Sequence, residues 1–467
     1  MQGATAAASA RSGEGAPEEV LHPRLARAGC HTSLRCHTSI AERSEVLDAS
    51  PLVSGTARPK SGCSDSPVPL TSSLKTAFPV PSRDRSRSGP TASAAAGRPL
   101  GTTYEIGQPP PLRGAGVCEK PASDDIQARA AVRRLERWKL QGVARVVVPE
   151  ERVSTCLRRP VPGEMGVGVW RQKERAHYSG LMVCGSVWVC PVCASKISET
   201  RRLELVEGIE TWKARGGRVL LLTLTVPHYA QQPLKGVLAG FTKARGLLRN
   251  RKTWKGWASR VGLKGSVRAL EVTHGGNGWH VHSHELLFLE GFAGGDLPGL
   301  EAEVLRMWQA ACETAGAGTP NEHGVRLHDG TYAAQYASKW GLDQELTKGH
   351  IKRGRGGNSS PWDLLREVLA TGEDEPAELF REYVKGFKGR RQLSYSEGLR
   401  CLLGLGVEQD DEELAARIEE EAVLLGSLSR SDWARVVLAE KRGEVLEVAT
   451  ATGWPGVVEL VRRLRGG

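Results

Sequence analysis

The stretch that decides the fold is GWHVHSHELLFL, residues 278–289. Histidines alternate with other residues and an apolar run follows, which is typical of a β-strand. Alternate side chains of a strand share a face, so His280, His282 and His284 should point one way and Val281 the other. The GGNG sequence at residues 275–278 predicts a hairpin turn that joins this strand to another at residues 266–274.

The histidine strand predicts a metal site. A hairpin centred on Gly276 and Asn277 places Glu271 opposite His282 on the same face, unless a bulge shifts the register. Two imidazoles and a carboxylate there would bind Mn²⁺, Mg²⁺ or Zn²⁺, whereas the simpler alternative is hydrogen-bonded sheet histidines. His280, at the mouth of the strand, is a further possible ligand or a DNA contact. Other carboxylates that could complete the site are Asp296, Glu301 and Asp329.

A second motif is YAAQYASK, residues 332–339. In a helix, Tyr332, Tyr336 and Lys339 lie along one face because they are four and three residues apart. A tyrosine hydroxyl, with a pKa of about 10, becomes a useful nucleophile only when a neighbour stabilises the phenolate. Lys339 could do so, or it could hold a phosphate. The alternative is that both tyrosines only pack against the protein.

The cysteines predict a structural zinc site. Cys184, Cys190 and Cys193 form a C-x5-C-x2-C cluster with proline in the tight turn. Four thiolates close a zinc tetrahedron without leaving a catalytic position, and Cys156 is the expected fourth ligand, with His177 in reserve.

Charge predicts an acidic partner. The formal net charge is +11, and residues 211–270 contain no Asp or Glu but many Lys and Arg. We expect this stretch, with a basic helix at 234–250, to bind nucleic acid through phosphate contacts and stacking. The expected DNA-binding residues are Lys243, Arg245, Arg249, Arg251, Lys252 and Trp254.

Composition also predicts the organisation of the chain. No run of about 18 apolar residues and no signal peptide occur, so we expect a cytoplasmic protein with no membrane contact and reduced or metal-bound cysteines. Residues 1–125 are rich in Ala, Ser, Gly and Pro and should be disordered. Strands interleaved with helices favour an α+β fold with a central antiparallel sheet. The expected regions are 1–125 disordered, 126–200 helix and zinc-binding cysteines, 201–345 the central sheet, and 346–467 mainly helical.

The order of three motifs resembles that of HUH-type rolling-circle replication initiators. The motifs are LLLTLTVPH at 220–228, HVHSHELL at 280–287 and YAAQYASK at 332–339. The sequences CGSVWVCPVCASKI at 184–197 and KGRRQLSYSEGLR at 388–400 look like the versions carried by actinobacterial plasmids. The resemblance covers about residues 152–400. It implies a central sheet of HUH-endonuclease type with flanking helices, a zinc-knuckle insertion before it, and residues 201–345 as the HUH endonuclease catalytic domain.

The resemblance also implies a function, namely metal-dependent nicking and rejoining of plasmid origin DNA. The family's two metal-binding histidines map to His282 and His284, although Ser283 stands where relatives have a bulky residue. The family's nucleophile maps to Tyr336, which would form a 5′-phosphotyrosine and leave a 3′-hydroxyl. Tyr332 stands where some relatives have a glutamate, and it resembles the second tyrosine of two-tyrosine enzymes. Lys339 matches the family's lysine.

The substrate implied is single-stranded or hairpin origin DNA, and the implied partners are a host helicase and a single-strand-binding protein. No phosphate-binding glycine loop is present, so no nucleotide cofactor is expected. Two other functions remain open at this point. An HUH-type transposase would share these motifs, and a zinc-containing DNA-binding regulator would need no chemistry at all.

Overall fold

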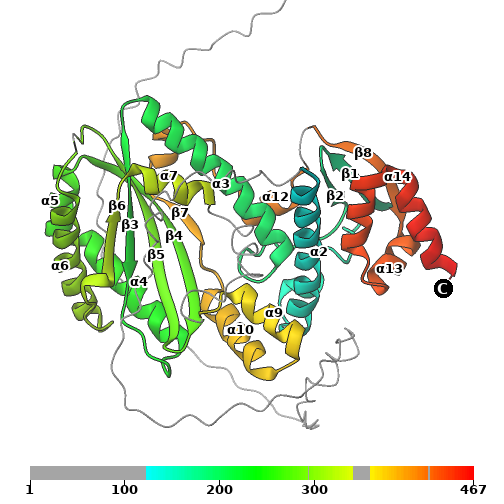
Figure 1. The fold of residues 1–467 in the computed structure, drawn as a ribbon, viewed down its shortest axis with the longest axis horizontal. Helices are drawn as coiled ribbons and strands as arrows, with labels where there is room; N and C mark the ends of the chain where they lie inside the picture. Colours follow the sequence, from blue (N-terminus) through cyan, green and yellow to red (C-terminus); the bar gives the residue numbers. More distant parts are fainter. Residues whose placement is uncertain (1–122, 293, 340–357, 419–420, 467) are drawn as a thin grey trace, which may run out of the picture. The chain divides into compact units, whose positions relative to one another are not determined.

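The computed structural model describes residues 123–292, 294–339, 358–418 and 421–466. Expectations for residues 1–122 and 340–357 therefore lie outside the described residues. All described residues belong to one compact unit, Pro67–Gly467. The helices, drawn in Figure 1, are α2 (Ser123–Val147), α3 (Pro191–Ala214), α4 (Leu234–Asn250), α5 (Lys252–Arg260), α6 (Leu297–Ala315), α7 (Gly330–Lys339), α9 (Pro361–Thr371), α10 (Asp374–Phe387), α11 (Leu399–Leu402), α12 (Asp411–Ala416), α13 (Arg430–Leu438) and α14 (Arg442–Gly466), with 3-10 turns at Arg152–Ser154 and Glu322–Gly324.

A five-stranded antiparallel sheet carries the histidine strand at its centre, with the strand order β6-β3-β5-β4-β7. These strands are β3 (Arg218–Thr225), β4 (Leu263–Gly275), β5 (Gly278–Leu289), β6 (Val325–His328) and β7 (Leu393–Tyr395). The expected α+β class with an antiparallel sheet is confirmed. Because β5 lies between β3 and β4, both neighbours can place side chains beside its histidines.

The predicted hairpin register is confirmed. Glu271 of β4 pairs directly with His282 of β5, and the hairpin closes at the pair Gly275 and Gly278. Gly278 has φ +80°, a conformation that suits glycine at this turn. The one register shift in this strand pair lies at the far end, between Leu263 and Gly265, so it does not disturb the site.

The two faces of the sheet pack against different helices. On one face, Leu286 and Phe288 of β5 join a core that also includes Ile209 of α3 and Ala333 of α7. On the other face, Leu287 joins the core built with α4 and α6. Since side chains alternate along a strand, His282 and His284 share the face of Leu286, on the side of α3 and α7.

A second, three-stranded antiparallel sheet has the order β2-β1-β8, formed by β1 (Gly166–Gln172), β2 (Arg175–Ser179) and β8 (Val423–Ser429). Val167, Tyr178 and Trp433 form part of its core with α13 and α14. The cysteine-bearing region and the C-terminal region thus share a sheet. Helix α3 also runs across the boundary expected between residues 200 and 201, and β7 joins the central sheet from beyond 345. The division of the chain into the regions 1–125, 126–200, 201–345 and 346–467 therefore stays a proposal.

Within the described part of the chain, no helix combines the length and apolar character needed to cross a membrane.

A buried ion pair ties α4 to the central strand. The Glu285 side chain is 0% exposed and accepts hydrogen bonds from Arg245, at 2.6 Å, and from Arg249. Burial would raise the pKa of Glu285, but the charges of Arg249 and Arg245 lower it to about 2. The carboxylate is therefore ionised in the folded protein, where it anchors two helix arginines to the sheet.

We predict that Glu285→Gln lowers the free energy of unfolding by about 3 kcal/mol, because two partly buried guanidinium groups lose their counter-ion. Urea denaturation measures this. Glu290→Gln is the matched control, since Glu290 pairs with Lys264 on an exposed surface, and it should cost less than about 1 kcal/mol.

The wild-type contribution of Glu285 should also depend on pH. An unfolded glutamate has a pKa of about 4.3, above the folded value, so this contribution is complete above pH of about 5 and falls as the pH drops toward 2. If Glu285→Gln and Glu290→Gln lower the free energy of unfolding by equal amounts at every pH, this account is contradicted.

Candidate metal and nucleophile site

Three side chains converge on the α3 and α7 side of the sheet. One ligand atom each of Glu271, His282 and His284 lies within 4.8 Å of the others. The Nε2 atoms of His282 and His284 lie 3.3 and 3.6 Å from the same carboxylate oxygen, Oε2 of Glu271. The strand pairing produces this arrangement, because Glu271 faces His282 across the hairpin and His284 follows two residues later.

The neighbouring strand orients His284. Thr223 of β3 pairs with His284 of β5, and its Oγ1 lies 2.8 Å from His284 Nδ1. This contact occupies one ring nitrogen and directs Nε2 toward Glu271, as is common for metal-binding histidines. The sequence motif gave no reason to single out Thr223, because its role depends on the long-range pairing of β3 with β5.

The donor set fits a divalent cation. One carboxylate and two imidazoles are suitable ligands for Mn²⁺ or Zn²⁺, and their three donor atoms already face one another. The group can therefore hold a metal ion.

Helix α7 brings Tyr336 to the same carboxylate. The Tyr336 hydroxyl donates a hydrogen bond of 2.7 Å to Oε1 of Glu271, and its ring centroid lies 4.8 Å from that of His284. Ala333 and Ala337 are buried against the sheet, so the helix approaches closely on its small side chains. The two carboxylate oxygens of Glu271 thus serve different neighbours: Oε2 faces the histidines and Oε1 binds the tyrosine.

The electrostatics keep Glu271 and His284 in the forms that can bind a metal. Burial would raise the pKa of Glu271, but His284, His282 and the Tyr336 hydroxyl lower it to about 2. Burial lowers the pKa of His284 to about 4, and nearby Glu271 only partly opposes this. At neutral pH, Glu271 is therefore a carboxylate and His284 is a neutral imidazole, as metal coordination requires.

The remaining predicted residues of this region are His280, Tyr332 and Lys339. His280 shares the face of His282 but does not join the three converging ligands. Tyr332 lies one turn before Tyr336, and its ring stacks on His328 at 4.6 Å. Lys339 is the last residue of α7, and its side chain lies outside the described part.

Three of the six predicted DNA-binding residues, Arg245, Arg249 and Trp254, make their contacts within the fold. They belong to the α4 and α5 region, and α4 packs on the sheet face opposite His282 and His284. Arg245 and Arg249 are bound to Glu285 within the fold. Trp254 is 3% exposed and stacks on Trp257, so a base cannot reach its ring, and the predicted stacking is wrong.

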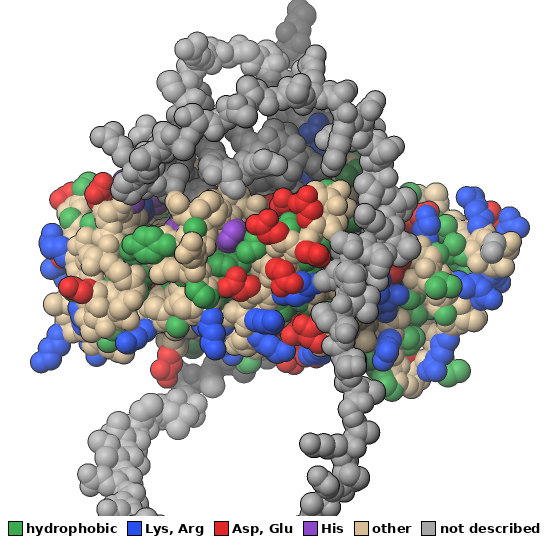
Figure 2. Space-filling model, turned by 90° about the horizontal axis from the view of Figure 1, so that it is seen from below, with side chains coloured by type: hydrophobic (Ala, Val, Ile, Leu, Met, Phe, Trp, Pro, Cys, Tyr) green, Lys and Arg blue, Asp and Glu red, His purple; other side chains and the backbone are tan. Residues whose placement is uncertain are grey.

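The basic stretch is therefore structural only in part, and DNA contacts by Lys243, Arg251 and Lys252 stay a prediction. Arg251 bonds to the carbonyl of Ala310 and the hydroxyl of Thr314, whereas Lys243 and Lys252 are exposed. Figure 2 shows Lys and Arg interspersed with Asp and Glu on one side of the molecule, rather than a surface of a single sign. Sequence composition revealed the positive charge but could not reveal which face of the sheet would carry it.

The four predicted cysteines come together. Cys156, Cys184, Cys190 and Cys193 are buried, and neighbouring sulfur atoms lie 3.5 to 3.8 Å apart. Burial opposes ionisation, but hydrogen bonds from the other three thiols and the Cys193 amide hold the pKa of Cys190 well below its usual range. His177, the reserve ligand, lies on β2 and is not in this cluster.

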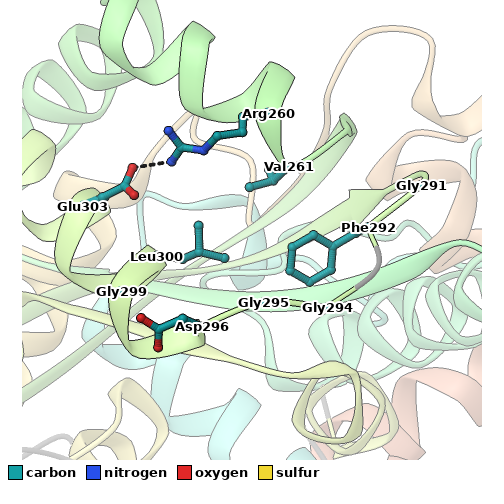
Figure 3. Close-up of a pocket in the computed structure, with 10 residues that line it drawn as sticks. All are labelled: Arg260, Val261, Gly291, Phe292, Gly294, Gly295, Asp296, Gly299, Leu300 and Glu303. Carbon is teal, nitrogen blue, oxygen red and sulfur yellow. Dashed lines mark hydrogen bonds and ion pairs between the residues drawn. The ribbon is translucent and has the colours of Figure 1, made fainter.

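A separate hollow of about 340 Å³ lies beyond the end of β5, between Phe292, Leu300 and the ion pair of Arg260 with Glu303 (Figure 3). None of the residues of the metal cluster lines it. Among the described residues, the groups of converging metal ligands do not include any residue of its walls.

We predict that Thr223→Val weakens Mn²⁺ binding by about 10- to 100-fold, because His284 loses the partner that fixes its ring. Isothermal titration calorimetry of the metal-free protein measures this. Thr223→Ser keeps the hydroxyl and should bind Mn²⁺ nearly as well as the wild type. Equal affinities for the Thr223→Val and wild-type proteins would rule out this role for Thr223.

Comparisons with known proteins agree with the predicted family. A family model described as Rep_1, replication protein, matches residues 180–424. "Protein rep" of Streptomyces lividans is 29% identical over 306 residues, which cover 50% of this chain and 67% of that protein.

A "Neomycin resistance protein" of Streptomyces cyanogenus is 31% identical over 137 residues, which cover 24% of this chain and 31% of that protein. No solved structure matches. The family match spans more than half of the chain and includes the histidine strand, the tyrosine helix and three of the four clustered cysteines. The chain therefore belongs to the Rep_1 family of replication proteins, and its predicted resemblance to the Rep proteins of actinobacterial plasmids is confirmed.

Proposed function

We propose that this protein initiates rolling-circle replication of a plasmid by nicking and rejoining origin DNA, with an HUH-type site. One observation carries the proposal: the Tyr336 hydroxyl lies 2.7 Å from Glu271, whose other oxygen faces His282 and His284. Membership of a replication protein family supports the biological role. A nucleophile and a metal-ligand group that share one carboxylate are suited to phosphoryl transfer.

Glu271, His282 and His284 would hold the divalent ion, Mn²⁺ or Mg²⁺. When bound, this ion supplies Lewis-acid polarisation of the scissile phosphate and offsets charge in the transition state. Thr223 holds the ring of His284 for this purpose. The two histidines and the carboxylate come from paired strands of a rigid sheet, which suits a site that must keep a fixed geometry.

Tyr336 would act as the nucleophile. Its hydroxyl already donates to Glu271, so its oxygen is oriented, and its proton leaves as the new bond forms. The tyrosine oxygen forms a bond to phosphorus as the bond from phosphorus to the 3′-oxygen breaks. The products are a 5′-phosphotyrosine and a 3′-hydroxyl, which takes up a proton and can prime a polymerase. Because the phosphodiester energy is retained, attack by a 3′-hydroxyl reverses the step and rejoins the strand.

The substrate would be single-stranded or extruded hairpin origin DNA, since a flexible strand can bring its phosphate to Tyr336. A host helicase and a single-strand-binding protein are the further partners proposed from the family resemblance. A transposase would use similar chemistry, but the family match favours replication. A regulator without chemistry would leave the contact between Tyr336 and Glu271 without a purpose.

The central test is a covalent adduct. Wild-type protein, Mn²⁺ and labelled single-stranded origin DNA should give a denaturant-resistant complex on a gel. Tyr336→Phe should lower its yield by at least about 100-fold, because the nucleophilic oxygen is gone. The account fails if the adduct persists in this variant or is absent with every origin strand.

Tyr332→Phe is the matched control on the same helix. Tyr332 stacks on His328 rather than binding Glu271, so the first adduct should form normally. We keep Tyr332 as a proposed auxiliary or second nucleophile. That role is removed if Tyr332→Phe also completes strand transfer at the wild-type rate.

We further propose that Cys156, Cys184, Cys190 and Cys193 bind a structural zinc ion. Four sulfur atoms at about 2.3 Å from zinc lie about 3.8 Å apart in a tetrahedron, which is close to the spacing observed here. The backbone amides of Cys184 and Cys193 donate to neighbouring sulfur atoms, which stabilises thiolate charge.

We expect about one zinc ion per chain by elemental analysis. Cys190→Ser should lose this zinc and lower the melting temperature, because the buried cluster then lacks a ligand. Cys401→Ser is the control, since Cys401 is exposed and lies outside the cluster. Zinc retained at the wild-type level in Cys190→Ser would contradict the assignment.

A further inference from the structure

The candidate site continues beyond the metal ligands as a row of rings. Each centroid in this row lies 4.8 to 5.1 Å from the next, in the order Tyr336, His284, His282, His280 and His228. The rings of His228 and His280 are inclined by only 33°. His228 follows β3, and the next residue in the chain is Tyr229. The row therefore leads from the proposed nucleophile to the turn after β3.

Tyr229 is exposed although it is aromatic. Its relative exposure is 65%, and it is the one aromatic among the exposed large hydrophobic side chains that the structure describes. A solvent-exposed tyrosine that directly follows the last residue of this row leaves an aromatic surface available to a ligand.

The turn that carries Tyr229 is well fixed. The Tyr229 amide donates to Gln232 Oε1, and the Gln232 amide donates to the Tyr229 carbonyl, each at 3.0 Å. A Cβ at Gly278, where φ is +80°, would lie 2.7 Å from the Tyr229 carbonyl oxygen. The turn thus packs against the first residue of the histidine strand. A ring held on such a turn loses little conformational entropy when it binds a ligand.

We propose that Tyr229, next to His228 at the end of the row away from Tyr336, stacks on a base of the single-stranded DNA at a distance from the scissile phosphate. This proposal rests on the single-stranded substrate of the proposed function. Stacking on an aromatic ring tolerates any base, because every base has a π-face. It also explains how the site could hold DNA when the predicted basic residues of α4 lie on the opposite face of the sheet. The ligand class is a nucleobase of single-stranded DNA.

The test measures binding without chemistry. The full chain carrying Tyr336→Phe is titrated, with Mn²⁺ present, against fluorescent oligothymidylate of about ten nucleotides and an abasic strand of the same length. We expect Tyr229→Ala to weaken oligothymidylate binding by about 5- to 30-fold and abasic binding by less than about twofold. Tyr229→Phe should stay within about twofold of the parent for both strands, since the ring remains.

Leu438→Ala is the control for loss of an exposed apolar side chain. Leu438 is 85% exposed at the end of α13, a helix that packs with the three-stranded sheet, and its removal should change neither affinity. The proposal is overturned if Tyr229→Ala weakens the binding of both strands equally or changes the binding of neither. It is also overturned if this variant only lowers the melting temperature, because the ring would then be a packing residue.

The adduct assay separates this proposal from the function on which it rests. If wild-type protein forms the Tyr336 adduct but Tyr229→Ala does not selectively weaken the binding of oligothymidylate, only the stacking proposal fails. If no adduct forms but Tyr229→Ala selectively weakens oligothymidylate binding, the nicking chemistry fails and the base-binding surface stands.

Discussion

The site depends on a single carboxylate. Glu271 faces His282 and His284 with one oxygen and accepts the Tyr336 hydroxyl with the other. Burial would raise the pKa of this carboxyl group, but His284, His282 and the Tyr336 hydroxyl lower it to about 2, so the group is ionised. The β4 and β5 pairing brings the ligands together, and α7 adds the tyrosine. A shift of one residue in the hairpin would turn Glu271 to the opposite face, where it could contact neither the two histidines nor Tyr336.

The two faces of the central sheet carry different groups of side chains. One face, toward α3 and α7, presents the ligands and Tyr336. The opposite face presents Glu285, whose ion pairs with Arg245 and Arg249 secure α4. His284 and Glu285 are adjacent in sequence but serve these different purposes, because neighbouring strand residues point in opposite directions. The arginines that make the chain basic are therefore partly used to hold the fold.

Sequence reasoning succeeded where the relevant contacts are local. The hairpin signal and the alternation of histidines predicted the pairing of Glu271 with His282, since a tight turn fixes the register. It missed Thr223, whose contact with His284 depends on a strand from a distant part of the chain. It misassigned Trp254, because composition does not report whether a side chain is buried. The shared sheet of β1 and β8 was missed for the same reason as Thr223, since that pairing is long-range.

The most direct measurement of the central claim is the position of the bound metal, determined by anomalous diffraction from crystals of the wild-type chain soaked in Mn²⁺. The account predicts one manganese peak at about 2.0 to 2.3 Å from a Glu271 oxygen and from Nε2 of His282 and His284. Replacement of His284 by Ala should remove that peak. A manganese ion bound elsewhere on the histidine face, or no ion at these three residues, would contradict the account.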